Sequence, residues 1–365
     1  MIYVIEPQCN GYEHLTCNIT FISLMQSIFP KKDLLFFANK SHAELLNFKL
    51  GNKQVNDISL LGEINHEEEF MRNLLKLSQQ KKIEKIIFLS IGSSQAYYAN
   101  KILKESSSKL YFFMHFVVSE LSRRPSINPL NFIKWIFWTL FFSNKKSEFI
   151  VFSNVIAKNV NKFLFGRHKV LSALLPYDMS MTDAKQNLLG SRTMNFVFPG
   201  EGRIEKGILE FIEISRNYAE NPDISFIVSG RMKIEESYIE DSGLDCIFSK
   251  QLLSEEEHID RLAKADYFVL LHQSKLYKYI YSGVLLESVK SLKPIIALRN
   301  PILDEFFQVY GEIGYLVNDV TEIKDLIDFI YRTGDERRGK FEQNLSKVVS
   351  RYEQDTLESL KMVLK

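Results

Sequence analysis

A glycine-rich turn between a predicted strand and a predicted helix carries the strongest chemical signal in the sequence. The strand at residues 195–199 runs into Gly200-Glu201-Gly202-Arg203, and a helix is predicted from Gly207. Glycines at the carboxyl end of a strand let the backbone approach a ligand, and the N-terminus of the next helix favours anions. Lys206 and Arg203 add positive charge at the same place. The turn is therefore predicted to bind a diphosphate-like anion. Because it matches neither a P-loop nor Gly-x-Gly-x-x-Gly, a structural turn with a solvated lysine is the alternative.

A second helix start carries residue types that suit phosphate oxygens and a ribose. Ser282 and Gly283 precede the helix predicted at 284–291, so backbone N–H groups there, including that of Val284, can face an anion. Glu287 follows about one turn later, where its carboxylate can accept two hydrogen bonds from a ribose diol. The alternative for Glu287 is an ordinary solvated carboxylate on a helix surface.

The elements that must position these residues alternate between strands and helices. The predicted strands are apolar runs without alternation, which is typical of parallel sheets covered by helices on both faces. Ser254 suits a helix N-cap, with Glu257 at the capping-box position. The pattern predicts an α/β fold with two Rossmann-like, doubly wound domains. Strands are predicted at 2–5, 34–38, 86–89, 110–118, 148–153, 195–199, 225–229, 245–248, 267–271 and 294–297, and helices at 18–29, 157–165, 207–218, 255–263 and 284–291.

Chain length and charge set the domain organisation. A chain of 365 residues is expected to form two domains, and the polar, aperiodic stretch near 178–193 suggests the link between them. A net charge of +1 argues against a nucleic-acid-binding protein, whose affinity would rest on a broad basic surface. We predict an N-terminal domain at 1–177, a linker at 178–194, a C-terminal ligand-binding domain at 195–335, and C-terminal helices at 336–365 that pack back towards the N-terminal domain.

Cysteine usage and hydropathy indicate the cellular compartment in which the chain is expected to work. The three cysteines, Cys9, Cys17 and Cys246, are sparse and odd in number. A Cys9–Cys17 disulfide is conceivable, but this usage favours free thiols in a reducing compartment. A metal site is not predicted, because the sequence has no second pair of Cys or His residues at close spacing. The first five residues have the pattern of a strand, and no stretch reaches the ~18 consecutive apolar residues of a membrane span.

The motifs of the C-terminal half follow one another in a familiar order. This order, over about residues 195–335, resembles the donor domain of retaining glycosyltransferases of family 4, which have the GT-B fold. The resemblance continues more weakly through 149–160. It implies two Rossmann-like domains facing a cleft, and sugar transfer from a nucleotide sugar to a saccharide or lipid-linked saccharide in cell-surface glycan synthesis, with no cofactor or metal. A sugar-nucleotide epimerase and a non-catalytic scaffold remain alternatives. The motifs are Lys206-Gly207, Ser229-Gly230, Ala265-Asp266, Glu287, 293–297 and 314–317.

The resemblance assigns the donor-binding residues. Lys206 and Arg203 would bind the diphosphate and assist catalysis, Glu287 would bind the ribose, and residues 248–252 would flank the base. Tyr279 stands where the family has the first glutamate of Glu-x7-Glu, which contacts the donor sugar. Glu201 stands where the family has arginine, so Arg203 is a candidate replacement. The full implied set is Gly202, Arg203, Lys206, Gly230, Lys250, Leu252, Tyr279, Ser282, Gly283, Val284 and Glu287.

The resemblance also places the acceptor on loops of the N-terminal domain. Gly11, His14 and Asn18 follow the first strand, His115 lies in the strand predicted at 110–118, and Glu120 lies just beyond it. His115 is a catalytic candidate because a histidine on this strand is common in the family beside the reacting sugar. The alternatives are a core residue for His115 and plain surface exposure for His14. A retaining enzyme can let the leaving phosphate take the acceptor proton, whereas an inverting one needs His14, His115 or Glu120 as base.

An aromatic and basic stretch at 121–147 suits a membrane surface. The stretch has no acidic residue, and it contains both tryptophans of the chain, Trp135 and Trp138, together with Arg123, Arg124 and Lys134. Aromatic rings and cations are favoured at the lipid interface. We expect peripheral attachment to the cytoplasmic face of a membrane, and a buried core helix or a dimer face is the alternative.

Overall fold

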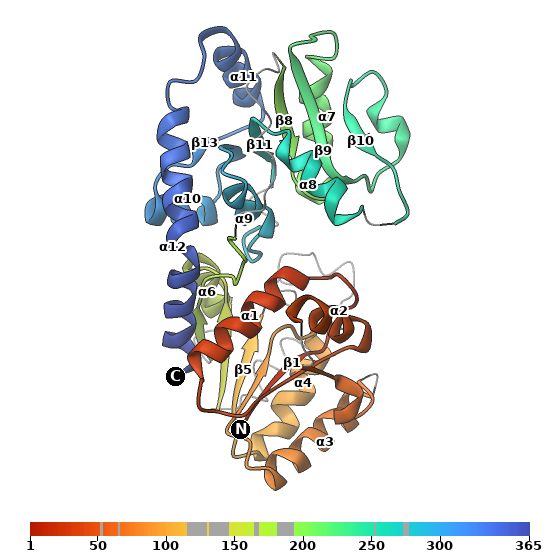
Figure 1. The fold of residues 1–365 in the computed structure, drawn as a ribbon, viewed down its shortest axis with the longest axis vertical. Coiled ribbons are helices and arrows are strands. Elements are labelled where there is room, and N and C mark those ends of the chain that lie inside the picture. The colour runs from red at the N-terminus through yellow and green to blue at the C-terminus, as the bar shows by residue number, and fades with distance from the viewer. Residues whose placement is uncertain are drawn as a thin grey trace. The chain divides into compact units, whose positions relative to one another are not determined.

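The protein was analysed as a computed structural model that describes residues 1–51, 54–64, 66–114, 130, 146–163, 168–180, 193–251, 253–272 and 277–365. The chain forms two compact units, each built on a parallel sheet with helices packed on it (Figure 1). The first unit contains residues 1–178, 278–281 and 353–365, and the second contains 179–277 and 282–352.

The first unit has a seven-stranded sheet in the order β3-β2-β1-β4-β5-β6-β7. All neighbouring strands are parallel, and Ile2 of β1 is in register with Leu34 of β2 and Lys85 of β4. The strand order reverses direction between β1 and β4, which is the place where doubly wound sheets bind ligands. The strands are β1 (Ile2–Glu6), β2 (Leu34–Ala38), β3 (Val55–Asp57), β4 (Lys85–Phe88), β5 (Lys109–Phe113), β6 (Ser147–Val151) and β7 (Lys169–Ser172). The helices are α1 (Leu15–Ile28), α2 (Lys40–Leu50), α3 (Glu67–Gln80), α4 (Ser93–Ile102) and α6 (Asn154–Phe163), with short 3-10 helices η1 (Ile58–Leu61) and η2 (Leu103–Glu105).

The second unit repeats this topology in a six-stranded parallel sheet of order β10-β9-β8-β11-β12-β13. Its switch point lies between β8 and β11, where Tyr267 is in register with Phe196. The strands are β8 (Met194–Phe198), β9 (Ile224–Arg231), β10 (Asp245–Ile247), β11 (Tyr267–Leu270), β12 (Ile295–Leu298) and β13 (Gly314–Val317). The helices are α7 (Ile208–Arg216), α8 (Glu255–Ala263), α9 (Gly283–Lys290), α10 (Pro301–Tyr310) and α11 (Thr321–Thr333), with 3-10 helices η4 (Ile204–Lys206) and η5 (Glu236–Ile239).

Aromatic side chains join the strands beside the second switch point. Phe196 of β8 stacks on Phe226 of β9 and on Tyr267 of β11, with ring centroids 5.4 and 5.7 Å apart. Phe226 also stacks on Tyr218, just beyond α7, at 5.6 Å. All four rings are buried. Their burial fixes the spacing of β8, β9 and β11, and therefore of the loops that leave the carboxyl ends of these strands.

The final helix, α12 (Arg338–Leu364), contributes to both units, because residues 353–365 belong to the first unit and 338–352 to the second. In the first unit, the ammonium of Lys85 and the hydroxyl of Tyr111 both donate to the carbonyl of Leu364, the latter at 3.3 Å. The backbone N–H of Leu174 donates to Ser359 Oγ at 3.0 Å. These bonds fix the last turns of α12 against the sheet.

The predicted α/β class is confirmed, and several predicted boundaries shift. The helix predicted from Asn18 begins at Leu15, directly after His14 in a left-handed conformation. The strand predicted at 110–118 ends at Phe113 in the structure. The helix predicted from Gly207 begins at Ile208, after the separate turn η4. The predicted capping box is confirmed, because Ser254 and Glu257 bond reciprocally at the start of α8.

Candidate functional site

The glycine-rich turn lies at the switch point of the second unit, where β8 ends. Gly200 adopts a left-handed conformation (φ +79°), and its N–H donates to Ser229 Oγ at 2.8 Å. Gly230 donates to the carbonyl of Gly200 at 3.1 Å, and a Cβ at Gly230 would lie 2.6 Å from the carbonyl carbon of Gly200. Such a contact is impossible for a side chain, so Gly230 permits the turn after β8 to lie directly against β9.

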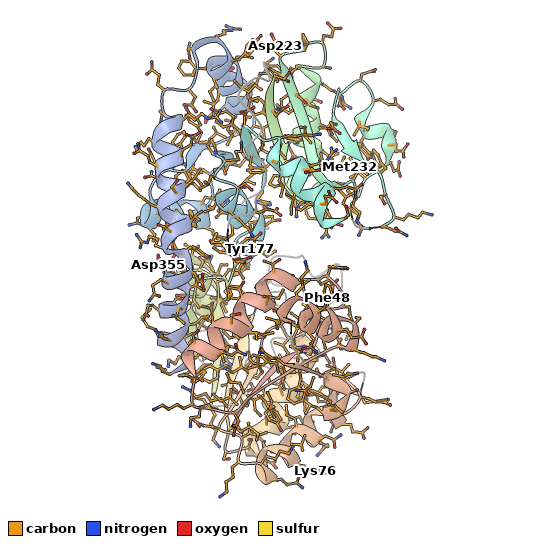
Figure 2. The ribbon with its side chains drawn as sticks, viewed as in Figure 1. Phe48, Lys76, Tyr177, Asp223, Met232 and Asp355 are labelled. Atoms are coloured by element: carbon orange, nitrogen blue, oxygen red, sulfur yellow. The ribbon has the colours of Figure 1, made fainter. Side chains whose placement is uncertain are left out.

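Gly202 has a structural role in the same turn. Its N–H donates to the carbonyl of Arg231 at 3.0 Å, and a Cβ at this position would lie 2.5 Å from the sulfur of Met232, which is labelled in Figure 2. The predicted donor-site residue Gly202 therefore anchors the turn to the end of β9, and its amide is already used.

Lys206 is the cation that the turn presents to the switch point. It ends η4, immediately before Gly207, whose left-handed conformation (φ +87°) lets the backbone contact Leu271 after β11. The Lys206 ammonium lies over Gly200, at 3.3 Å from where a Cβ of that glycine would be. Val284 of α9 reaches the same point, also at 3.3 Å. The turn, Lys206 and the start of α9 thus meet around Gly200.

The charge of Lys206 is poorly compensated. Burial is the main cause that lowers its pKa, and the nearby charge of Arg203 lowers it further, while Glu287 and Glu201 act in the opposite direction. Across the described part of the chain, no group forms a hydrogen bond or ion pair with the Lys206 ammonium. A desolvated cation without a counter-ion favours an anionic ligand.

Arg203, by contrast, already has a carboxylate partner. Glu201 accepts from Arg203 and from Arg231 Nε, the latter at 2.8 Å, and lies 3.9 Å from Lys233 Nζ. Burial acts to raise the pKa of Glu201, but the hydrogen bonds from Arg231 and Arg203 outweigh it and lower this pKa. A ligand phosphate would have to share Arg203 with Glu201, so Lys206 is the cation better placed to bind it.

Glu287 is paired with a histidine that the sequence analysis did not identify. His258 of α8 donates from Nε2 to Glu287 Oε1 at 2.8 Å and from Nδ1 to the carbonyl of Ser229 at 3.1 Å. Because both ring nitrogens face acceptors, the geometry favours the protonated imidazole. Burial acts to lower the pKa of His258, yet the hydrogen bond and charge of Glu287 raise it above 6.5. One Glu287 oxygen is thereby fixed, and Oε2 has no partner in the described residues.

The N-terminus of α9 supplies backbone donors at the same place. Ser282 is the N-cap and makes no side-chain capping bond, and a Cβ at Gly283 would meet nothing within 4 Å. The first-turn N–H groups of a helix have no partners within the helix. Together with Lys206, these amides form a positive end that faces the glycine turn.

The remaining predicted donor-site residues are more dispersed. The carbonyl of Lys250 accepts from Arg231 at 2.5 Å, close to the turn. Tyr279 lies in the segment 278–281, which belongs to the first unit, where the carbonyl of Lys278 accepts from Asn159 at 3.0 Å. A second histidine absent from the sequence analysis, His272, follows β11. Burial, and then the charge of Lys206, lower its pKa to about 3, so it is neutral.

In the first unit, the predicted acceptor residues surround the loop after β1. His42 accepts from Asn18 Nδ2 at 2.9 Å and donates from Nδ1 to the carbonyl of Gly11 at 2.7 Å. Both predicted residues are therefore bound to a buried histidine that sequence analysis did not identify. His14 is the N-cap of α1 (φ +50°), and burial is the main cause that lowers its pKa.

A small cavity of about 20 Å³ lies beside this loop, lined in part by Glu6, His14 and Asn18. Glu6 accepts from the N–H groups of Gln8 and Cys9, at 2.9 and 3.1 Å, and from Ser90. The three cysteines are free thiols in the structure. Burial raises the pKa of Cys17 to about 12, so this thiol is not a nucleophile at neutral pH.

Several predicted residues lie outside the described part of the chain: His115, Glu120, Leu252, Arg123, Arg124, Lys134, Trp135 and Trp138. Among the residues that the structure describes, no three His, Cys, Asp or Glu side chains gather to hold a metal ion. No helix within the described ranges is long and apolar enough to cross a membrane.

Solved structures with a similar architecture are sugar-transferring and sugar-nucleotide proteins. A glycosyltransferase from Rickettsia africae ESF-5 aligns with a TM-score of 0.67 and 10% identity, over 99% of this chain and 96% of that chain. Anabaena HepE in complex with UDP and glucose aligns with a TM-score of 0.67 and 11% identity, over 100% and 97%. The chain has the GT-B fold. UDP-GlcNAc 2-epimerase from Neisseria meningitidis, bound to UDP-GlcNAc, aligns with a TM-score of 0.58 and 10% identity, over 100% of both chains. No protein-family model and no curated protein sequence matches the chain.

The His258–Glu287 pair of this GT-B protein is expected to make its stability depend on pH. Because the folded-state pKa of His258 is raised, its contribution is fully present below the ordinary value of 6.5 and is lost as the pH rises through the folded-state pKa. We expect the difference in unfolding free energy between wild type and His258→Gln to shrink over this rise. Urea denaturation of both proteins at stepped pH measures it. His14 and His272, whose pKa values are lowered, affect the pH dependence of both proteins equally, so their effects cancel in the difference. A difference in unfolding free energy that stays constant with pH would show that His258 is neutral.

Proposed function

We propose that the protein is a glycosyltransferase that takes a sugar from a nucleotide-sugar donor bound at the glycine turn of the second unit. The observation that carries this proposal is the desolvated Lys206 ammonium, which has no counter-ion in the described residues and lies over Gly200 beside the start of α9. A diphosphate supplies the missing negative charge. The GT-B fold of the chain supports this assignment, since neighbours with that fold bind UDP or UDP-glucose.

The same geometry suits departure of a nucleoside diphosphate. As the bond between sugar and phosphate breaks, negative charge accumulates on the leaving oxygen. A fixed cation and helix N-terminal amides stabilise such charge without reorganisation, because they are already oriented in the free protein. Lys206 provides the cation and α9 the amides. Arg203 contributes to the extent that the diphosphate displaces Glu201 from it.

Glu287 is proposed to bind the ribose of the donor. His258 fixes one carboxylate oxygen at 2.8 Å, which orients the other oxygen for a hydroxyl of the ligand. Membership of family 4 and retention of configuration are proposed on the motif order around these residues. Tyr279 is then the residue that departs from the family at the donor sugar, so the identity of that sugar is expected to differ from donors bound by a glutamate.

Solved structures of epimerases with a similar fold support an alternative function. UDP-GlcNAc 2-epimerases share the fold at TM-scores of 0.54 and 0.58. An epimerase converts the donor alone, whereas a transferase needs an acceptor and releases the nucleoside diphosphate. Incubation of the protein with UDP-GlcNAc, in parallel without and with a saccharide acceptor, followed by separation of the sugar products, distinguishes them. A scaffold without catalysis would give neither product.

Three further properties are proposed from the sequence. The acceptor is a saccharide or a lipid-linked saccharide in cell-surface glycan synthesis, the reaction needs no metal, and the protein works on the cytoplasmic face of a membrane. The last proposal rests on the aromatic and basic residues at 121–147. A lipid-linked acceptor and membrane attachment support each other, because such an acceptor is presented at the lipid surface.

Replacement of Lys206 by methionine tests the donor site. We expect turnover to fall by ~10²-fold or more, because a charge-assisted contact to the leaving diphosphate contributes ~3 kcal/mol. The melting temperature should stay the same or rise, since the variant removes a desolvated charge without a partner. Initial rates of UDP release and thermal unfolding measure the two effects. Lys264→Met, on the exposed end of α8, is the matched control. Normal turnover in folded Lys206→Met would remove Lys206 from the site.

Replacement of Glu287 by glutamine tests the ribose contact. Calorimetric titration with UDP should show weaker binding by roughly tenfold, the effect of losing a hydrogen bond to a charged acceptor. Glu256→Gln, exposed on α8, controls for the change of charge. His258→Gln should weaken binding less than Glu287→Gln, because His258 acts by orienting Glu287. An unchanged dissociation constant for Glu287→Gln would make it a structural partner of His258 alone.

Replacement of Trp135 and Trp138 by serine tests membrane attachment. The double variant should no longer float with vesicles that contain anionic lipid, because interfacial aromatic anchors are lost. Added salt should release the wild type only in part, since screening removes the electrostatic share alone. Phe48→Ser, an 80% exposed aromatic of the first unit, is the control. Wild-type protein that never floats would refute attachment, and an unfolded double variant by circular dichroism would indicate a core helix.

A further inference from the structure

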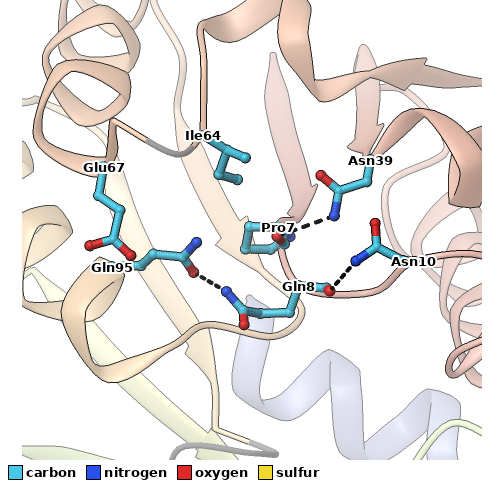
Figure 3. Close-up of a pocket in the computed structure, with 7 residues that line it drawn as sticks. All are labelled: Pro7, Gln8, Asn10, Asn39, Ile64, Glu67 and Gln95. Atoms are coloured by element: carbon cyan, nitrogen blue, oxygen red, sulfur yellow. Dashed lines mark hydrogen bonds between the residues drawn. The ribbon is translucent and has the colours of Figure 1, made fainter. Parts of the chain in front are cut away.

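A second, larger pocket opens in the first unit, at the carboxyl ends of its strands. It has a volume of about 350 Å³, at the lower end of the range of small-molecule sites. Figure 3 shows the residues around it. They come from the loop after β1, the residue that follows β2, the loop before α3, and the first turns of α3 and α4. We call it the amide pocket, because most of its polar side chains are carboxamides. Its lining residues are Pro7, Gln8, Asn10, Asn39, Ile64, Glu67 and Gln95.

Backbone carbonyls fix the orientation of two of these amides. Asn39 Nδ2 donates to the carbonyls of Pro7 and Cys9, at 3.4 and 3.0 Å. Asn10 Nδ2 donates to the carbonyl of Gln8 at 3.3 Å. A carbonyl can only accept, so the nitrogen of each side chain must face it. The side-chain oxygens of Asn39 and Asn10 are therefore left as acceptors.

A backbone N–H fixes the other two amides. Gly92, at the start of α4, donates to Gln95 Oε1 at 3.2 Å, so this oxygen must be the atom that faces Gly92. Gln8 Nε2 donates to the same oxygen at 2.6 Å, as Figure 3 shows. Gln95 Nε2 and Gln8 Oε1 remain unused by any described residue. The Gly92 amide, already bonded to Gln95, is not available to an anion.

The charge of the pocket is negative. Glu67, at the first turn of α3, accepts from Ser94 with one oxygen, and the other has no partner in the described residues. Among the residues that the structure describes, no lysine or arginine lines the pocket. The unused groups are thus acceptors on Gln8, Asn10, Asn39 and Glu67 and a donor on Gln95. Such walls match a ligand that carries many hydroxyl groups, and they repel phosphate and carboxylate.

We propose that the amide pocket binds an uncharged polyhydroxylated ligand, a saccharide, and that it excludes phosphorylated and carboxylated sugars. Hydroxyl groups donate to the amide and carboxylate oxygens and accept from Gln95, while Ile64 and Pro7 contact the C–H face of a ring. The assignment of this saccharide to the acceptor rests on the proposed function. It restricts that acceptor to one whose bound sugar is neutral.

Saturation-transfer NMR on the full chain tests the proposal with matched pairs of sugars. The pairs are glucose with glucose 6-phosphate, and galactose with galacturonate. We expect the neutral member of at least one pair to receive saturation and neither anionic member to do so. Absence of transfer to both neutral sugars, or equal transfer to the anions, would overturn the proposal.

Two variants with matched controls place the binding in the pocket. Ile64→Trp fills the pocket and should weaken binding of the neutral sugar by roughly tenfold or more. Leu60→Trp, on the exposed side of η1, should leave this binding unchanged. Glu67→Gln should admit galacturonate, whereas Glu69→Gln on the same helix turn should not. Equal effects within either pair would refute the assignment.

UDP titration of the same proteins separates this proposal from the proposed function. Retained UDP binding by Ile64→Trp shows that the second unit is intact, and a circular dichroism spectrum and melting curve that match the wild type show that the first unit is folded. Saccharide binding by a wild type that does not bind UDP would refute the donor site and leave the saccharide pocket standing. UDP binding without saccharide binding would refute the saccharide pocket and leave the donor site standing.

Discussion

Direct backbone contact between the turn after β8 and the end of β9 is the constraint on which the switch point of the second unit depends. Gly230 has no side chain, so the carbonyl of Gly200 can lie against it, and the turn can bend back over the sheet. That bend places Gly200 beneath the Lys206 ammonium and beside Val284 of α9. The aromatic stack through Phe196, below the turn, holds β8 and β9 at the required spacing. The geometry at the switch point therefore depends both on the missing side chain of Gly230 and on the packing of the aromatic rings below the turn.

Charge within this turn is divided between a satisfied cation and an unsatisfied one. Glu201 compensates Arg203 and Arg231 within the protein. Lys206 is left with only distant carboxylates, and burial lowers its pKa. Removing Glu201 would free Arg203 for an anion, but it would also leave Arg203 and Arg231 to repel each other in the absence of a ligand. Among the described residues of this turn, Lys206 Nζ is therefore the cation to which we assign the proposed diphosphate.

The sequence predicted the features that depend on residues close together in the chain. Apolar runs without alternation identified the central strands, and the glycine turn and the start of α9 were found from residue type and order alone. Helices α2 and α3 were missed, although Phe70, Met71 and Leu74 of α3 recur at helical spacing and are buried. Contacts between distant residues could not be read from one sequence. His258 lies 29 residues from Glu287, and His42 lies 24 residues from Asn18. The amide pocket is of the same kind, since topology alone brings its loops together.

The path of α12 has a consequence for how such a chain can recombine. Residues 353–365 complete the first unit, where Leu360 and Leu364 are fully buried and the Leu364 carbonyl accepts from Lys85. A single genetic crossover near residue 178 would join one sheet to the last helical turns of another ancestor. The buried side chains at positions 360 and 364 would then pack against a first unit with which they had not coevolved. Exchange of the second unit as a working module therefore needs two junctions, one after residue 178 and one after residue 352, with 278–281 matched to the first unit.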